Sequence, residues 1–395
     1  MKFTKKVLNN GLIVLHEKRD VPVTTVMLGV RYGSAYESEK EKGIAHFIEH
    51  LCFKGTEKRT PKEIASEIEK VGGILNAFTS EEVTAYHCKL PSEHLEIAMD
   101  VIFDIFFNPV FPEEDVKKEA KVICEEIRMY HDNPRFYVME KVKENMYKKP
   151  FGMSAAGKEE VIKSMARKEL IEKHRKIYFP ENSILAVVGK NDFEEVLKLS
   201  EKFSVLRKGN TEKIKKIEKI NLRKKETRKD MQQANIALGL HFPFSEGERY
   251  AAEVFASILG EGMSSKLFSE IREKRGLAYA VKTEIELGKN YGYMVIYIGT
   301  SKEKIDEVIE LCLKEFKKMG GISERELEDG KMQVAGNYKV ASEGSDETAL
   351  NLMLKEARGE AEDYYRYEEN VRKVSLGHIK KLAEISDYSY SVLSN

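Results

Sequence analysis

The segment His46–His50 carries two histidines and a glutamate at a spacing that could hold a catalytic metal ion. On a helix, positions i and i+4 lie on one face, so His46 and His50 would direct two imidazoles at the same point. Neutral imidazoles suit zinc, and a catalytic zinc ion keeps three protein ligands and leaves a fourth position for water. Glu49 lies on the same side of the helix and could take the proton of that water. The spacing therefore predicts zinc-dependent hydrolysis with Glu49 as the general base.

The neighbours of these side chains favour a metal site over two incidental surface histidines. They are small or apolar: Gly43, Ile44, Ala45, Phe47 and Ile48. Ionisable side chains among apolar residues need a partner. For the third ligand, the helix predicted over residues 113–131 offers Glu119, Glu125 and Glu126. Glu119 and Glu126 share a helix face, but spacing alone does not choose among the three glutamates.

Short strands and longer helices alternate along the chain. Helices are predicted over residues 43–53, from Thr60-Pro61 to Gly72-Gly73, and over 92–107 and 113–131. Strands are predicted in a hairpin around Asn10-Gly11, over 23–32, twice within 74–90, over 183–189, and in a hairpin over 284–299 that helices follow to about residue 320. This mixture predicts an α+β fold.

A weak internal repeat divides the chain. Residues 25–32, Thr-Val-Met-Leu-Gly-Val-Arg-Tyr, resemble residues 235–242, Asn-Ile-Ala-Leu-Gly-Leu-His-Phe, and a loop and a helix are expected after each. We therefore predict two similar α+β halves related by duplication. The zinc-bearing half would span residues 1–210, a charged linker 211–230, and the inactive half 231–395. Only the first half contains the His-Glu-His cluster.

Composition argues against two classes of partner. The 66 Lys and Arg residues balance the 66 Asp and Glu residues, so no basic field exists for nucleic acid. The sequence contains no apolar stretch long enough to predict a signal peptide or a membrane span. The four cysteines, Cys52, Cys88, Cys124 and Cys312, form no Cys-x-x-Cys pair and are expected to be buried, reduced thiols. We therefore expect a cytoplasmic protein that binds neither nucleic acid nor membrane.

Several segments together resemble the inverzincin peptidases of the pitrilysin family, which includes the mitochondrial processing peptidase and insulin-degrading enzyme. The segments are Gly33–Glu37, Gly43–His50, Phe53–Thr56, Leu75–Ser80, Glu119–Tyr130 with Asp132 and Pro134, and Tyr178–Asn182. The resemblance covers essentially the whole chain, which looks most like the short prokaryotic members. It implies that Glu126 is the third zinc ligand, that Glu119 supports the site from behind the ligands, and that Glu125 is a surface residue. It also implies that Asn76 and Ala77 lie on an edge strand that pairs with the substrate backbone.

The second half carries a further family segment, Ile271–Tyr279. By the resemblance, Arg272 and Tyr279 would close over the zinc site, bind the peptide and stabilise the carbonyl oxygen as it gains charge. Without the resemblance, an exposed helix arginine and a turn tyrosine would be the simpler interpretation. In the family, a zinc half and an Arg/Tyr half from different pairs enclose a cavity. We therefore expect a homodimer, or a heterodimer with a related subunit.

These observations predict a zinc-dependent endopeptidase with one Zn²⁺ per chain. Its substrates would be unstructured peptides or presequence-like segments. One alternative is a catalytically silent scaffold or partner subunit of a heterodimeric peptidase, and the complete motif argues against it. Another alternative is a metal-dependent amidase that acts on small molecules. The Asn76 segment and the Arg272/Tyr279 pair argue against that class, because in the family both serve extended peptides.

Overall fold

The computed structural model of the chain describes residues 2–395, with the backbone alone for Lys2 and Glu246. These residues pack into two compact units. Unit 1 comprises the residues up to Ile127 together with Ser154–Lys215 and Ala341–Tyr364, and unit 2 comprises Arg128–Met153, Lys216–Val340 and Tyr365–Asn395. Each unit has its own sheet and its own hydrophobic core. The predicted α+β fold class is confirmed.

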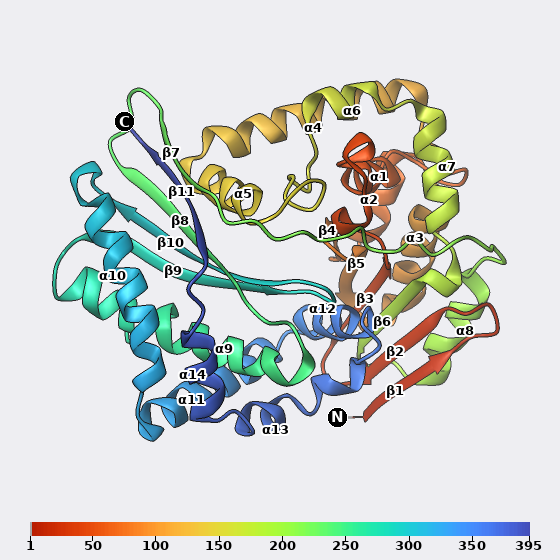
Figure 1. Cartoon of the computed structure of the whole chain (residues 1–395). Helices are drawn as coiled ribbons and strands as arrows, with labels where there is room; N and C mark the ends of the chain where they lie inside the picture. Colours follow the sequence, from red (N-terminus) through yellow and green to blue (C-terminus); the bar gives the residue numbers. More distant parts are fainter. Residues whose placement is uncertain (1) are drawn as a thin grey trace. The chain divides into compact units, whose positions relative to one another are not determined.

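Unit 1 is built on a six-stranded sheet (Figure 1). Its strands are β1 (Lys2–Val7), β2 (Ile13–Lys18), β3 (Val23–Val30), β4 (Ile74–Thr79), β5 (Thr84–Pro91) and β6 (Ser183–Gly189). The order is β1-β2-β6-β3-β5-β4, with β2 and β6 parallel and the other neighbours antiparallel. The helices are α1 (Ile44–Cys52), α2 (Pro61–Glu69), α3 (Leu95–Phe107), most of α4 (Glu113–Asp132), α6 (Glu159–Ser164), α7 (Arg167–Ile177), α8 (Phe193–Phe203) and α12 (Ser345–Glu356).

Unit 2 is built on a five-stranded sheet. Its strands are β7 (Arg223–Thr227), β8 (Ala234–His241), β9 (Ala278–Leu287), β10 (Gly292–Thr300) and β11 (Tyr388–Ser394). The order is β7-β11-β8-β10-β9, with β7 and β11 parallel and the other neighbours antiparallel. The helices are α5 (Pro134–Met146), α9 (Glu246–Gly260), a π-helical segment Phe268–Glu273, α10 (Ile305–Lys318), most of α11 (Glu324–Ala341), α13 (Tyr367–Arg372) and α14 (Leu376–Ala383).

The five strands of unit 2 repeat an arrangement already present in unit 1. Strands β2-β6-β3-β5-β4 and β7-β11-β8-β10-β9 have the same order and the same relative directions, with the parallel pair first in each. The repeated sequence falls on the equivalent central strands, β3 and β8. The internal similarity of the sequence therefore corresponds to a similarity of structure.

Each unit also receives one helix from the other half of the chain. Helix α5 packs on β8 and β11 of unit 2, and α12 packs on β3 and β6 of unit 1 (Figure 1). A glycine in each central strand makes room for this helix. A Cβ atom on Gly29 would lie 2.5 Å from Met353 Sδ, and one on Gly239 would lie 2.3 Å from Met146 Sδ. This exchange was not predictable from the sequence, because periodicity shows that a helix has an apolar face but not which sheet covers it.

The predicted elements lie where the sequence placed them, with two differences. Strand β7 lies inside the stretch 211–230 that was expected to be a linker. Its side chains are mostly exposed because it is an edge strand, so no apolar alternation marks it. The hairpin predicted over 284–299 is confirmed, but its first strand begins at Ala278 and therefore places Tyr279 in β9 rather than in a turn.

Two smaller expectations agree with the structure. Thr60 caps α2, since its side chain accepts a hydrogen bond from the backbone N–H of Glu63, and Pro61 begins the helix. All four cysteine side chains are buried. Among residues 2–395, no helix is both long and apolar enough to cross a membrane.

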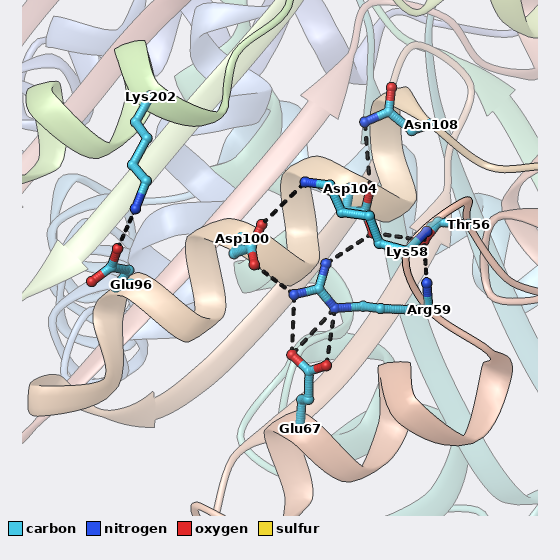
Figure 2. Close-up of polar contacts among 9 residues, drawn as sticks. All are labelled: Thr56, Lys58, Arg59, Glu67, Glu96, Asp100, Asp104, Asn108 and Lys202. Atoms are coloured by element: carbon cyan, nitrogen blue, oxygen red, sulfur yellow. Dashed lines mark hydrogen bonds and ion pairs between the residues drawn. The ribbon is translucent and has the colours of Figure 1, made fainter.

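The loop between α1 and α2 is fixed by Arg59 (Figure 2). The Arg59 guanidinium lies 3.1 Å from Glu67 of α2, and 2.5 Å and 2.9 Å from Asp100 and Asp104 of α3. Thr56 donates a further hydrogen bond to Asp104 at 2.6 Å. Charge-assisted hydrogen bonds of this kind are among the stronger polar contacts in proteins. They hold α2 against α3 and so fix its place after the end of α1.

Candidate metal centre

Helix α1 packs its apolar side chains into the core of unit 1. The buried residues are Ile44, Ala45, Phe47, Ile48, Leu51 and Cys52. The side chains of His46, Glu49 and His50 take the remaining side of the helix and stay partly exposed. The core therefore fixes the helix, and the helix presents the three ionisable groups together.

The beginning of α1 is held by a buried carboxylate. Glu37 accepts hydrogen bonds from the backbone N–H groups of Gly43, at 3.0 Å, and Ala45, at 2.9 Å. Its charge is balanced by Lys42, whose Nζ lies 3.6 Å from Glu37 Oε2, and both side chains are fully buried. N–H groups at the start of a helix have no partner within the helix and carry partial positive charge. The carboxylate accepts their hydrogen bonds and also balances that charge.

Three ligand atoms converge at the exposed side of α1. His46 Nε2 and His50 Nε2 lie 3.2 Å apart, and Glu126 Oε2 of α4 lies 3.7 Å from the first and 3.6 Å from the second. Ligands bonded to zinc at about 2.0–2.1 Å in a tetrahedral arrangement lie about 3.4 Å from one another. The triangle is close to that size, and its donor set of two imidazoles and a carboxylate suits zinc. These three residues could hold a metal ion.

Glu119 supports His50 from behind. Its Oε2 lies 3.1 Å from His50 Nδ1, and its Oε1 accepts a hydrogen bond from Lys54 Nζ at 2.8 Å. A carboxylate can only accept, so His50 Nδ1 carries the hydrogen and His50 Nε2 faces Glu126. His46 differs, because its buried Nδ1 has no hydrogen-bond partner among the described residues. Of the two histidines, only His50 therefore has a hydrogen-bond partner at Nδ1.

The pKa values of the cluster favour one positive charge at its centre. Burial and the neighbouring His50 lower the pKa of His46 to about 4. Burial also opposes the charge of His50, but hydrogen bonds to Glu119 and Glu126 outweigh it and raise the pKa of His50 to about 9. Burial likewise opposes ionisation of Glu119, yet hydrogen bonds from His50 and Lys54 lower its pKa. Glu119 and Glu126 therefore favour positive charge beside His50.

Glu49 is oriented by the sheet. Thr79, the last residue of β4, donates a hydrogen bond from Oγ1 to Glu49 Oε2 at 2.5 Å. Burial raises the pKa of Glu49, and the hydrogen bond from Thr79 opposes that effect. The carboxylate is therefore held in one position on the same helix as the two histidines.

Strand β4 ends the sheet beside α1 and leaves one edge open. Among the described strands it pairs only with β5. Asn76 is exposed, and its Oδ1 accepts a hydrogen bond from the backbone N–H of Ala77 at 2.8 Å. A side chain that covers an edge N–H in this way protects the strand from unwanted pairing. Asn76 and Ala77 thus lie on an edge strand, as the resemblance implied.

A cavity of about 360 Å³ lies between the beginning of β4, helix α2 and the end of α1. Most of its lining is apolar: Phe53, Pro61, Ile64, Ala65, Ile74 and Leu75. Phe53 follows α1 directly, and the Arg59 network holds the α2 wall in place. The cavity beside β4 is therefore suited to an apolar side chain of a bound molecule.

Arg272 and Tyr279 lie in unit 2 and contact each other there. Arg272 Nη1 donates a hydrogen bond to the backbone carbonyl of Tyr279 at 3.1 Å, and its guanidinium lies 4.8 Å from the ring centre of Phe268. The Tyr279 side chain is 51% exposed, and its ring lies against Gly299, where a Cβ would meet it at 2.2 Å. About half of Tyr279 is thus exposed, while its hydroxyl end lies against Gly299 and contacts Tyr297.

Glu37, Lys54 and Thr79 contribute contacts at this site that the sequence did not predict. All three lie in or beside segments that carried the family resemblance, which was the available signal. Their contacts were not predictable, because each depends on how separate elements pack. Glu125 is exposed on α4, next to the Glu126 that joins the cluster.

Comparison with known proteins defines the class. The family model described as "Insulinase (Peptidase family M16)" matches residues 12–159, and "Peptidase M16 inactive domain" matches residues 164–334. A protease from Helicobacter pylori has the same fold, with a TM-score of 0.91 at 23% identity over 100% of this chain and 99% of that one. The "peptidase M16 inactive domain" structure from Pseudomonas fluorescens also gives 0.91, at 18% identity over 100% and 98%. The fold is that of M16-like peptidases.

Two curated relatives are more similar in sequence. An "uncharacterized zinc protease" of Rickettsia bellii is 35% identical over 347 residues, which cover 86% of this chain and 84% of that protein. The "uncharacterized zinc protease YmxG" of Bacillus subtilis is 34% identical over 344 residues, covering 85% and 83%. The chain belongs to peptidase family M16, the pitrilysin family.

Proposed function

We propose that the chain is a zinc-dependent endopeptidase that cleaves extended, unstructured peptides. The observation that carries this proposal is the convergence of His46 Nε2, His50 Nε2 and Glu126 Oε2 beside a glutamate that the sheet holds in place. The two relatives named as zinc proteases support the choice of metal.

The chemistry follows from the residues at this centre. His46, His50 and Glu126 would hold one zinc ion per chain, which when bound supplies a Lewis acid and lowers the pKa of a water molecule. Glu49 accepts the proton of the attacking water and then donates it to the leaving amine. Thr79 keeps the Glu49 carboxylate directed during both transfers. Glu119 keeps the Nε2 atom of His50 facing Glu126.

The open edge of β4 supports an extended peptide as the substrate. A peptide that adds to β4 as a strand would bond to main-chain groups, which gives affinity with little sequence specificity. The Asn76 side chain would turn away from the N–H of Ala77 and free that donor. The apolar cavity beside Phe53 and Leu75 would receive a bulky apolar side chain of the peptide. A small amide would use neither feature.

Arg272 and Tyr279 would complete the site from the partner half of another copy. Tyr279 would donate a hydrogen bond to the carbonyl oxygen as it gains charge, and Arg272 would bind the peptide. Their contact within unit 2 and the exposure of Tyr279 support this role. The proposal requires a homodimer, or a heterodimer with a related subunit. Sedimentation should show association, and a fully active monomer would contradict it.

The test is metal content together with cleavage of an unstructured fluorogenic peptide, with a small amide substrate alongside. Wild type should carry about one zinc per chain and cleave the peptide but not the amide. Glu49→Gln should keep the zinc and lose about 10²–10⁴-fold in kcat, because it removes the acid–base group alone. Glu125→Gln, an exposed glutamate on α4, serves as the control and should behave as wild type.

Two results would contradict the proposal. A wild-type protein that binds zinc but cleaves no peptide would favour a silent partner subunit. A protein that binds no metal ion would remove the basis of the mechanism.

A further inference from the structure

A second cavity in unit 1 shares no lining residue with the metal centre. Its volume is about 310 Å³, and it lies between the end of α3 with the following loop, helix α7, and the chain after α8. Arg167, Arg175 and Arg207 line it together with His174, and Glu57 is the one acidic residue of its lining. If His174 is neutral, the lining carries a net charge of about +2.

Two of these arginines are fixed by neutral partners. Arg167 donates hydrogen bonds to the backbone carbonyls of Phe111 and, at 3.0 Å, Val110. Arg207 donates to the carbonyl of Phe107, the last residue of α3, at 2.9 Å. Carbonyl groups satisfy N–H donors but do not balance a full charge, and the C-terminus of a helix offers only about half a negative charge. Among the described residues, neither guanidinium forms an ion pair.

Arg175 differs from the other two arginines of the cavity, because no partner holds its guanidinium in place. Its side chain is exposed, and within the described part of the chain it forms no hydrogen bond or ion pair. All five of its N–H donors are therefore available, and so are donors that Arg167 and Arg207 do not use. The exposure of Arg175 also leaves the cavity open to solvent on that side.

The like charges lie close enough to affect one another. Burial lowers the pKa of Arg207, and the nearby Arg175 lowers it further. Burial likewise lowers the pKa of His174 to about 3, with Arg207 and Arg175 adding to that effect against a hydrogen bond to the Phe106 carbonyl. His174 is therefore neutral at physiological pH. The positive charges of the cavity come from the arginines alone.

Arg59 shows how the same unit neutralises an arginine for structural purposes. Its guanidinium contacts three carboxylates, Glu67, Asp100 and Asp104 (Figure 2). The arginines of the second cavity have the opposite arrangement, with neutral acceptors behind them and open space in front. Fixed, unbalanced guanidinium groups around a cavity are the arrangement of an anion site.

We propose that this cavity binds the phosphate group of inorganic phosphate or of a phosphate monoester. A dianion balances a lining charge of about +2, whereas a single carboxylate leaves half of it unbalanced. The planar fork of arginine matches two oxygens of a tetrahedral phosphate group. Inorganic phosphate and a monoester share this chemistry, and their relative affinities distinguish the two sources.

The test is isothermal titration of the full chain with inorganic phosphate and with glycerol phosphate, at constant ionic strength. Wild type should bind at one saturable site, and the ligand that binds more tightly is the source favoured by the cavity. Arg175→Ala should weaken binding by about 10–100-fold, because it removes charge-assisted hydrogen bonds. Since Arg175 is exposed and forms no hydrogen bond or ion pair within the described part of the chain, the variant should fold normally.

The control is Lys168→Ala, which removes an exposed positive charge from the same helix outside the cavity. It should leave the affinity unchanged. Equal affinities of wild type and Arg175→Ala, or no saturable binding of either ligand, would overturn the proposal. Binding that survives Arg175→Ala but disappears after treatment with a chelator would place the anion at the metal centre, and would overturn it as well.

Discussion

Strand β3 of unit 1 and strand β8 of unit 2 occupy the same place in equivalent sheets, but the chain that follows them differs. After β3, a loop containing Glu37 leads to α1, which carries His46, Glu49 and His50. After β8, a shorter connection leads to α9, which contains no histidine. The sheets alone therefore do not create the site. The chemistry depends on side chains placed on one copy of a repeated scaffold.

The edge strands of the two sheets show a second contrast. In unit 1, β4 ends with Thr79, which orients Glu49. In unit 2, the equivalent strand β9 carries Tyr279, half exposed and backed by Arg272. One edge therefore holds Glu49, the proposed base, and the other carries Tyr279, the proposed oxyanion donor. We interpret this as a division of labour in which unit 1 holds the metal and unit 2 assists the reaction.

The largest effect should come from removing the ligand that α4 contributes. Glu126→Gln should abolish measurable cleavage and weaken zinc binding by more than about 100-fold. That loss exceeds the roughly 10–100-fold loss of metal affinity that is usual when a residue supporting a ligand is removed. Glu125→Gln should change neither quantity, because its side chain is exposed beside the site. Zinc affinity can be measured by competition with a chromogenic chelator. Equal zinc affinities of the two variants would remove Glu126 from the ligand set.

A variant in unit 2 should lower activity without touching the metal. Tyr279→Phe should reduce kcat by about 10²–10³-fold, the usual effect of removing one donor to a developing oxyanion. Its zinc content should equal that of wild type. Tyr365→Phe, which alters another partly exposed tyrosine of unit 2, is the control. Loss of zinc in Tyr279→Phe would break the proposed division between the units.

Removing the carboxylate that supports His50 should weaken zinc binding less than removing a ligand. Glu119→Gln should weaken zinc binding by about 10–100-fold, since it removes the charged acceptor of the His50 Nδ1 hydrogen. Glu114→Gln, in the exposed first turn of the same helix, provides the control. If both variants kept wild-type zinc affinity, the contact between Glu119 and His50 would be structural only.

The equivalence of the two sheets predicts matched stability effects. Gly29→Ala and Gly239→Ala should each lower the free energy of unfolding by about 1–3 kcal/mol, because the added methyl group meets a methionine of the exchanged helix. The flexible ends of those methionines favour the lower part of that range. Gly336→Ala, on α11 with open space around it, should not destabilise the protein. Urea unfolding that showed a cost at only one strand would contradict equivalent packing.

Local sequence patterns predicted the parts of the site that a single element determines. The spacing of His46 and His50 follows from helix geometry, and the sequence of residues 74–90 predicted two strands, the first of which carries Asn76. The third ligand could not be chosen this way, because Glu119, Glu125 and Glu126 all lie on one helix. The family resemblance selected Glu126, and the structure brings that side chain to the two histidines.

What local patterns could not predict depends on packing between distant elements. Strand β7 has no apolar face to reveal it, since it is a charged edge strand recognised only by its pairing with β11. The exchange of α5 and α12 leaves no trace in either helix taken alone. The hydrogen bond from Thr79 to Glu49 joins a strand to a helix that precedes it in the chain. Each of these three features arises from contacts between separate elements, so it became visible only in the structure.

The most direct test of the central claim is X-ray absorption at the zinc edge on the purified full chain. We expect about one zinc per chain, with nitrogen and oxygen ligands at about 2.0–2.2 Å, two of them imidazoles, and no sulfur ligand. In Glu126→Gln, the zinc should be lost or its ligand shell altered. Sulfur in the ligand shell, or zinc whose spectrum is unchanged in Glu126→Gln, would contradict the assignment of His46, His50 and Glu126.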